Sequence, residues 1–135
     1  MKFCLILLMI LLSGCHTESK QKLILCEEAA IIDKHEKISF KELYAAENTI
    51  DGKDIILEGF FSLYFEDISL YPSKHNRNQK GVWLSFSDYM MDQDSMLIKL
   101  NGKKIEIAGT IDLSRKGHLG AYFCTITNIV CVSEK

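Results

Sequence analysis

The stretch Asp51–Phe65, DGKDIILEGFFSLYF, decides the fold of this chain. It begins with a turn signal, Asp51-Gly52, and its side chains then alternate between two faces with the period of a β-strand. The face expected to point inward consists of Ile55, Leu57, Gly59, Phe61, Leu63 and Phe65. Because glycine has no Cβ and adopts bulge geometry easily, Gly59 predicts a sharp bend in the middle of a long strand.

The same pattern returns fifty residues later as NGKKIEIAGTIDL, which spans Asn101–Leu113. Five of the thirteen aligned positions are identical, and Gly109 occupies the place in this segment that Gly59 occupies in the first. Two long strands that each follow a glycine turn and each contain a central glycine predict a small, strongly coiled barrel.

The remaining segments supply the other elements of such a barrel. The five expected strands are the segment ending at Phe65, then Ile68–Tyr71, Val82–Ser87, Lys104–Leu113 and Ala121–Val132. A capping box of Ser39 and Glu42 predicts a helix of about nine residues that ends near Asn48. Residues 88–99 are expected to contain a second short helix.

Five strands with a helix-prone connection between the third and the fourth give the element order of an OB-fold. We therefore predict a mostly β fold: a small five-stranded OB-like barrel with one or two short helices. The alternative is an open antiparallel sheet that the Ser39 helix covers.

The domain organisation predicted from the sequence has three parts. Residues 1–14 are a lipoprotein signal peptide, residues 15–38 a lipidated tether with an ambiguous apolar segment, and residues 39–135 the barrel. Within the second part, KLILCEEAAIID at Lys22–Asp33 suits either a strand or a helix, and the charged residues Asp33–Lys37 are expected to form a loop.

The motifs of the barrel segment resemble those of a family of small, mostly uncharacterised bacterial proteins with OB-like barrels. The motifs that carry the resemblance are Gly52-Lys53, Glu58-Gly59, Leu70-Tyr71 and Gly117-His118-Leu119-Gly120. The resemblance covers Ser39–Val132. It implies the barrel fold, and it implies no catalytic residue.

The first fourteen residues have the composition of a secretory signal. Lys2 provides a positive charge, and Phe3–Leu12 is an apolar run too short to span a bilayer permanently. The sequence that follows, Leu12-Ser13-Gly14-Cys15, resembles the bacterial lipobox, which implies cleavage before Cys15 and a diacylglycerol on its sulfur. Two or three acyl chains anchor a protein stably. We expect a lipid-anchored, extracytoplasmic protein on the cell membrane or the outer membrane.

Charge disfavours one class of partner. Loss of residues 1–14 leaves 15 Lys and Arg against 18 Asp and Glu. A net negative chain is not what a general nucleic-acid binder shows, so nucleic acid is not the expected partner.

Three cysteines, Cys26, Cys124 and Cys131, remain in the mature chain beyond Cys15, and they would lie in an oxidising compartment. Three thiols allow at most one intramolecular bridge. Cys124 and Cys131 fall on opposite faces of one expected strand and cannot pair. A bridge from Cys26 to Cys131 or to Cys124 is feasible, and three buried, inert thiols are the alternative.

The outer face of the expected barrel carries the candidate ligand-binding residues. OB-folds bind ligands on strands two and three and the adjoining loops, where aromatic rings stack on bases or sugars. An aromatic platform with a cationic rim is expected from Phe60, Tyr64, Tyr71, Trp83, Lys74, Arg77 and Lys80. The alternative is that the Ser39 helix, or the segment after Lys22, covers these rings.

Other chemistry finds little support in the sequence. The four histidines show no ligand spacing, so no metal or cofactor is expected, and no serine, cysteine or threonine stands in a nucleophile motif. We expect a non-catalytic binding module, anchored to a membrane through Cys15, for a partner protein or an envelope glycan. The alternative is a structural or assembly accessory of an envelope complex that binds no small ligand.

Overall fold

The computed structural model describes residues 22–27 and 29–135. The predicted signal peptide, residues 1–14, and the predicted lipid attachment at Cys15 lie outside the described residues. Among the described residues, no helix has both the length and the apolar character that crossing a bilayer requires.

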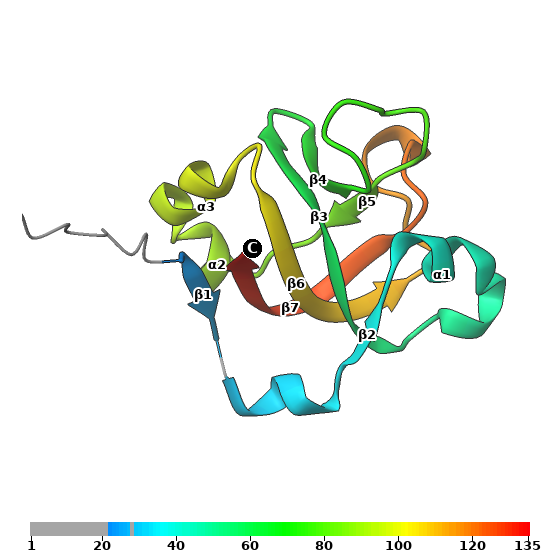
Figure 1. Cartoon of the computed structure of the whole chain (residues 1–135), viewed down its shortest axis with the longest axis horizontal. Helices are drawn as coiled ribbons and strands as arrows, with labels where there is room; N and C mark the ends of the chain where they lie inside the picture. The colour runs from blue at the N-terminus through cyan, green and yellow to red at the C-terminus, as the bar shows by residue number, and fades with distance from the viewer. Residues whose placement is uncertain (1–21, 28) are drawn as a thin grey trace, which may run out of the picture.

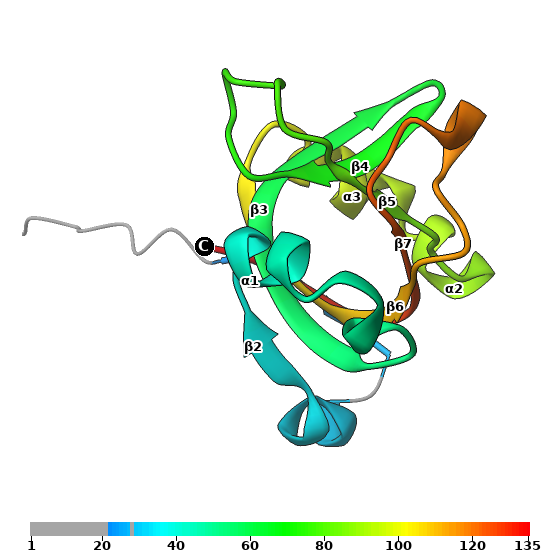
Figure 2. The same ribbon diagram turned by 90° about the vertical axis from the view of Figure 1, so that its right-hand side faces the viewer.

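A closed five-stranded β-barrel forms the centre of the molecule (Figures 1 and 2). Its strands are β3 (Asp54–Tyr64), β4 (Asp67–Tyr71), β5 (Val82–Leu84), β6 (Lys104–Asp112) and β7 (Thr125–Glu134). The order around the barrel is β3, β4, β5, β7, β6 and back to β3, and only the pair of β5 and β7 is parallel. The predicted OB-like barrel is confirmed, and the open-sheet alternative is wrong.

Gly59 and Gly109 lie in neighbouring strands of the barrel, as the repeat predicts. Gly59 is opposite Ile105, and Gly109 is opposite Ile55. A Cβ added to Gly59 would lie 2.7 Å from the carbonyl oxygen of Tyr71, and one added to Gly109 would lie 2.8 Å from that of Thr127. The register of β6 against β7 also shifts next to Gly109. Both glycines therefore allow backbone to approach where the sheet coils.

Short helices close the two ends of the barrel (Figures 1 and 2). At one end, α1 (Phe40–Ala45) and η2 (Glu47–Ile50) bury the side chains of Phe40, Leu43 and Ile50. At the other end, α2 (Asp88–Met91) and α3 (Asp94–Leu100) bury Met90, Leu97 and Leu100. These side chains join the inward residues of the strands in one continuous core.

Several predicted boundaries need correction. The first helix ends at Ala45, and η2 follows it, because the backbone at Glu47 has a positive φ of 48°. The third strand ends at Leu84 instead of Ser87, since Ser87 caps α2. The fifth strand begins at Thr125 instead of Ala121, because the preceding residues form η3 (His118–Gly120) and a loop that packs on the barrel.

Two strands before α1 extend the sheet, although the sequence predicts a loop and an ambiguous segment there. β1 (Ile24–Cys26) pairs antiparallel with β7, and β2 (Glu36–Ile38) pairs parallel with β3. Between them lies η1 (Ala29–Lys34). The prediction of a loop at Asp33–Lys37 is wrong, because the backbone of Glu36–Ile38 pairs with a strand far away in the sequence.

The pairing of β1 with β7 places Cys26 opposite Cys131, and the two form a disulfide. Of the two bridges that the sequence allows, the structure contains this one. Cys124 is free and buried, and it precedes β7 instead of sharing a strand with Cys131. Burial raises the pKa of its thiol to about 12, so this cysteine behaves as a small apolar side chain.

Candidate functional site

The four aromatic residues of the predicted platform lie on the outer face of β3, β4 and β5. Phe60 is directly opposite Tyr71, and Trp83 is opposite Ser69. Tyr64 lies at the end of β3 and is 63% exposed, whereas the other three rings are half-buried. The rings are thus on the predicted face, but they do not form one open surface.

Arg77 covers the ring of Tyr71. Its guanidinium carbon lies 3.8 Å from the ring centroid, and its Nη1 lies 3.5 Å from Oδ2 of Asp67. This stacked cation occupies the ring face that a ligand would need. Lys74 and Lys80 are exposed, and in the described part of the chain neither side chain makes an ion pair or a ring contact. Of the three predicted cations, only Arg77 meets the aromatic face.

Trp83 is covered by the loop that leads into β7. Its ring packs edge-on against Tyr122, with centroids 5.1 Å apart, and a Cβ added to Gly117 would lie 2.7 Å from the Cβ of Trp83. The Ser39 helix lies elsewhere: its Tyr44 packs against Phe123 at 5.1 Å. The alternative prediction from the sequence is that the Ser39 helix, or the segment after Lys22, covers the aromatic rings. The loop before β7 covers Trp83 instead.

The carboxylate of Asp67 links several elements of this face through hydrogen bonds. Its oxygens accept hydrogen bonds from the hydroxyls of Ser62 at 2.6 Å, Ser69 at 2.5 Å, Tyr122 at 2.8 Å and Tyr71 at 3.2 Å. Three of the donors belong to β3 and β4, and the fourth comes from the loop before β7. Asp67 thus fixes that loop against the sheet.

The same hydrogen bonds set the protonation states in this network. Burial alone would raise the pKa of Asp67, but the four hydroxyl donors outweigh it and hold the pKa below its ordinary value. Burial, together with the adjacent carboxylate, raises the pKa of Tyr122. The network is therefore an ionised carboxylate that accepts four hydroxyl hydrogen bonds and pairs with the guanidinium of Arg77. It suits positioning better than acid–base catalysis.

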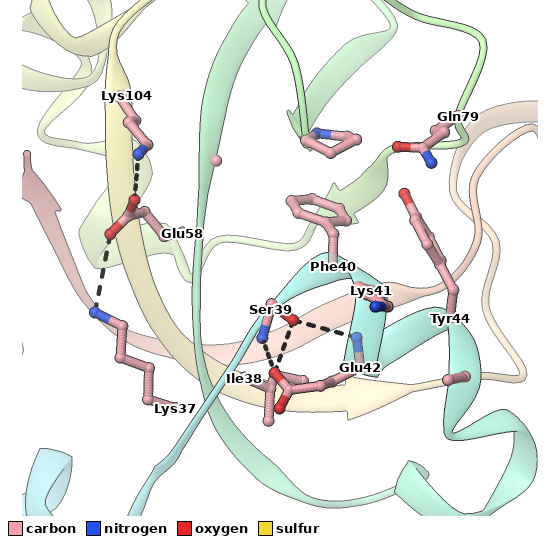
Figure 3. Close-up of a pocket in the computed structure, with 13 residues that line it drawn as sticks. Lys37, Ile38, Ser39, Phe40, Lys41, Glu42, Tyr44, Glu58, Gln79 and Lys104 are labelled. Atoms are coloured by element: carbon pink, nitrogen blue, oxygen red, sulfur yellow. Dashed lines mark hydrogen bonds and ion pairs between the residues drawn. The ribbon is translucent and has the colours of Figure 1, made fainter.

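An open groove of about 890 Å³ lies beside this face (Figure 3). It follows from the strand pairing: on one edge of β3, residues 55–57 pair with β2 and residues 60–64 pair with β4. Glu58 and Gly59 lie between the two partner strands and line the groove, together with α1 and the loop after β4. Its volume is within the range of about 300–1,000 Å³ that is usual for ligand sites.

The groove has an apolar floor and a polar rim. Phe40, Ile38 and Pro72 contribute apolar surface, and Tyr44 and Gln79, both labelled in Figure 3, contribute polar groups. The hydroxyl of Tyr44 donates a hydrogen bond to the carbonyl oxygen of Lys80 at 2.5 Å, which holds the loop after β4 near α1. Burial raises the pKa of Tyr44 to about 12, so it stays a neutral donor.

Paired charges form the other end of the groove. Lys104 pairs with Glu58, and Lys37 lies 3.8 Å from Glu58 (Figure 3). Lys37 also lies 2.8 Å from Glu106. The hydrogen bond from Lys104 is the largest influence on Glu58 and lowers its pKa, while that to Glu106 raises the pKa of Lys37. Lys37, Glu58 and Lys104 line the groove, so this end offers a ligand both hydrogen-bond donors and acceptors.

Sequence reasoning missed the groove and the Asp67 network. None of the seven predicted ligand residues lines the groove. The sequence does contain partial signals: the capping box locates Ser39 and Phe40, and the alternation in Asp51–Phe65 places Glu58 on the face opposite the inward residues. Their convergence depends on the parallel pairing of β2 with β3, which no local pattern predicts.

Comparison of the chain with known protein families, with curated proteins and with solved structures finds no match. The resemblance to small bacterial OB-like proteins stays a prediction. Within the described residues, no cluster of three or more histidine, cysteine, aspartate or glutamate side chains has the geometry to hold a metal ion.

Proposed function

We propose that this chain is a non-catalytic, lipid-anchored binding module of the OB type that works outside the cytoplasm. Its ligand is a partner protein or an envelope glycan, and its anchor is a lipid on Cys15 at the cell membrane or the outer membrane. It is a member of the small bacterial OB-like lipoproteins that its motifs resemble.

The observation that supports binding is the groove between β2, β4 and α1. Its volume of about 890 Å³ is within the range usual for ligand sites, and its lining combines an apolar floor with donors and acceptors of both charges. Extended peptides and glycans present that same mixture of apolar faces and hydrogen-bonding groups. The hydrogen-bonded Asp67 network and the absence of a nucleophile motif in the sequence favour binding over catalysis.

The binding proposal can be tested by site-specific photo-cross-linking in the native envelope. A benzophenone amino acid replaces Gln79, which is exposed on the groove rim, and the matched control replaces Ile98, which is exposed on α3 at the opposite end of the barrel. Position 79 should give a discrete adduct and position 98 none. An adduct that muramidase digestion removes identifies a glycan, and one that digestion leaves unchanged identifies a protein. Equal patterns at the two positions would contradict a groove ligand.

The anchor requires a separate experiment. Cells are labelled with radioactive palmitate and express either the wild-type chain or the Cys15→Ala variant. The label should appear only in the wild type, because diacylglycerol transfer requires the thiol of Cys15. Equal labelling of the two proteins would contradict the proposed lipid anchor. It would not affect the groove proposal, which the cross-linking experiment tests separately.

A second candidate function, a docking accessory without a small ligand, is favoured by exposed apolar residues at the β3–β4 turn. Phe65 is 93% exposed, and Leu119 is 89% exposed on η3. Nε2 of His118 lies 3.4 Å from Oε2 of Glu66, which brings the turn and η3 together. A Phe65→Ser variant that abolishes recruitment to an envelope complex, together with the lack of an adduct at position 79, would support this function.

A further inference from the structure

A second, smaller cavity lies next to Trp83, apart from the groove. It has a volume of about 330 Å³ and is lined by Trp83, Arg115, Lys116, Gly117, His118 and Thr125. Its lining therefore combines an indole on β5 with a basic loop between β6 and β7. We call this cavity the Trp83 pocket.

The basic loop is held in place on the indole. Thr125 Oγ1 donates a hydrogen bond to the carbonyl oxygen of Arg115 at 3.0 Å, and the N–H of Tyr122 donates one to that of Lys116 at 3.1 Å. Gly117 has a positive φ of 64°, and its missing Cβ would lie 2.7 Å from Trp83. The loop backbone thus lies directly against the indole, and the Asp67–Tyr122 hydrogen bond fixes its far end. The pocket is largely formed before any ligand arrives.

The pocket carries more positive than negative charge on its lining. Within residues 22–27 and 29–135, no ion pair joins the side chain of Arg115 or Lys116 to a carboxylate. Two carboxylates lie near the rim: Glu66 contacts His118, and Asp112 accepts hydrogen bonds from the backbone of Ser114 and Arg115. Neither of them lines the cavity. Asp112 also acts on the charge of Arg115 at longer range, but neither cation makes a direct ion pair. Two cations that line a small cavity without a direct ion pair favour an anionic ligand.

We propose that the Trp83 pocket binds a small acidic sugar, whose carboxylate or phosphate pairs with Arg115 and Lys116 while its ring lies against Trp83. The volume is near the lower end of the range for ligand sites, so it fits one ring with one charged group and not a polymer segment. A neutral sugar would form no ion pair with either cation. This site is distinct from the groove, and it does not depend on the proposed function.

Trp83 is the only tryptophan in the chain, so its fluorescence reports directly on the pocket. The protein is titrated with D-glucuronate and with glucose 6-phosphate, and methyl glucoside serves as the neutral comparison. Both anions should change the emission of Trp83 saturably, and methyl glucoside should not. Equal saturable changes with methyl glucoside would overturn the proposal, as would no saturable change with either anion. Binding of uridine monophosphate without binding of the sugar acids would also overturn it.

The double variant Arg115→Gln/Lys116→Gln should weaken binding of glucuronate at least about tenfold, because hydrogen bonds to charged groups are lost. The matched control is Lys53→Gln/Lys99→Gln, which makes the same change of charge at exposed positions outside the pocket and should bind as the wild type does. Thermal unfolding of both variants shows whether they are folded. Wild-type affinity in a folded Arg115→Gln/Lys116→Gln protein would contradict the proposal. Either result leaves the adduct at position 79 unaffected.

Discussion

At the scale of single residues, Asp67 carries the most interactions on the outer face of the barrel. It lies at the first position of β4, where it meets hydroxyls from two strands and from the loop before β7. A buried or half-buried carboxylate is stabilised only when hydrogen bonds replace its lost water. Asp67 meets this condition, and its removal should therefore disturb both the sheet and the loop.

We predict that Asp67→Asn lowers the free energy of unfolding by about 1–3 kcal/mol at neutral pH, because an amide accepts fewer and weaker hydrogen bonds than a carboxylate. Urea unfolding measures the change. Asp33→Asn, at an exposed position, is the matched control and should be within about 0.5 kcal/mol of the wild type.

The contribution of Asp67 should also depend on pH. Its folded-state pKa lies below the ordinary value of 3.8, so the unfolded chain binds the proton more readily. The Asp67 carboxylate contributes its full stabilisation at pH values above its unfolded-state pKa. This contribution is lost as the pH falls below about 4 and through the lower pKa of Asp67 in the folded protein. The gap in unfolding free energy between the wild type and Asp67→Asn should narrow in acid. A gap that stays constant down to the lowest pH at which both proteins fold would contradict the ionised network.

Gly59→Ala should destabilise the protein by about 1–3 kcal/mol through overpacking. The new methyl group would lie within 2.9 Å of Tyr71 O, the Leu70 side chain and the Phe40 ring, so strand and helix must move apart. Lys53→Ala, at an exposed position, is the control. Chemical denaturation that gives the same midpoint for both variants would show that β3 has room at this position.

At the scale of elements, α1 is short and depends on its cap. Ser39 Oγ accepts from the N–H of Glu42 at 3.2 Å, and a Glu42 carboxylate oxygen accepts from the N–H of Ser39 at 2.7 Å. A helix of six residues has little stability alone, so the cap and the burial of Phe40 and Leu43 hold it. The helix in turn forms one wall of the groove.

We expect Ser39→Ala to destabilise the protein by about 1 kcal/mol, the usual contribution of an N-cap. Ser95→Ala, an exposed change within α3, is the matched control and should be neutral or slightly stabilising, because alanine favours helices. Thermal unfolding compares the two. A larger loss at Ser95 than at Ser39 would show that the cap does not hold α1.

The elements also show where prediction from sequence succeeds. β3 and β6 were predictable because burial alternates along most of each strand and a glycine turn precedes each of them. β2 was not, since Glu36 and Lys37 are exposed and only Ile38 enters the core; its strand conformation comes from pairing with β3. The candidate sites also combine residues that a local sequence pattern identifies with residues that only the folded chain brings together. Trp83 and Tyr71 stood out as outward aromatics, whereas Arg115 and Lys116 reach Trp83 only through the folded loop.

At the scale of the whole molecule, the Cys26–Cys131 disulfide joins the first described strand to the last. It links residues 105 positions apart, so it strongly restricts the unfolded chain. Among the described cysteines, Cys124 is the one that remains free, and it is buried.

The double variant Cys26→Ala/Cys131→Ala should lose about 2–5 kcal/mol of unfolding free energy, the usual range for a native bridge. A reducing agent should lower the urea midpoint of the wild type and leave that of the double variant unchanged. Cys124→Ala is the control, because it should keep the sensitivity to reductant. If the reducing agent does not change the urea midpoint of the wild type, the disulfide contributes nothing to stability.

The pairing of β1 with β7 also determines how the barrel would be oriented relative to a membrane. The N–H of Glu134 donates to the carbonyl oxygen of Leu23 at 2.9 Å, so both ends of the described chain meet on the side of the barrel away from α1 (Figure 1). If Cys15 carries the proposed lipid, a fluorescent reporter fused after Lys135 should lie close to the bilayer. Reporters inserted in the exposed loop after β4 would instead extend outward, beside the groove.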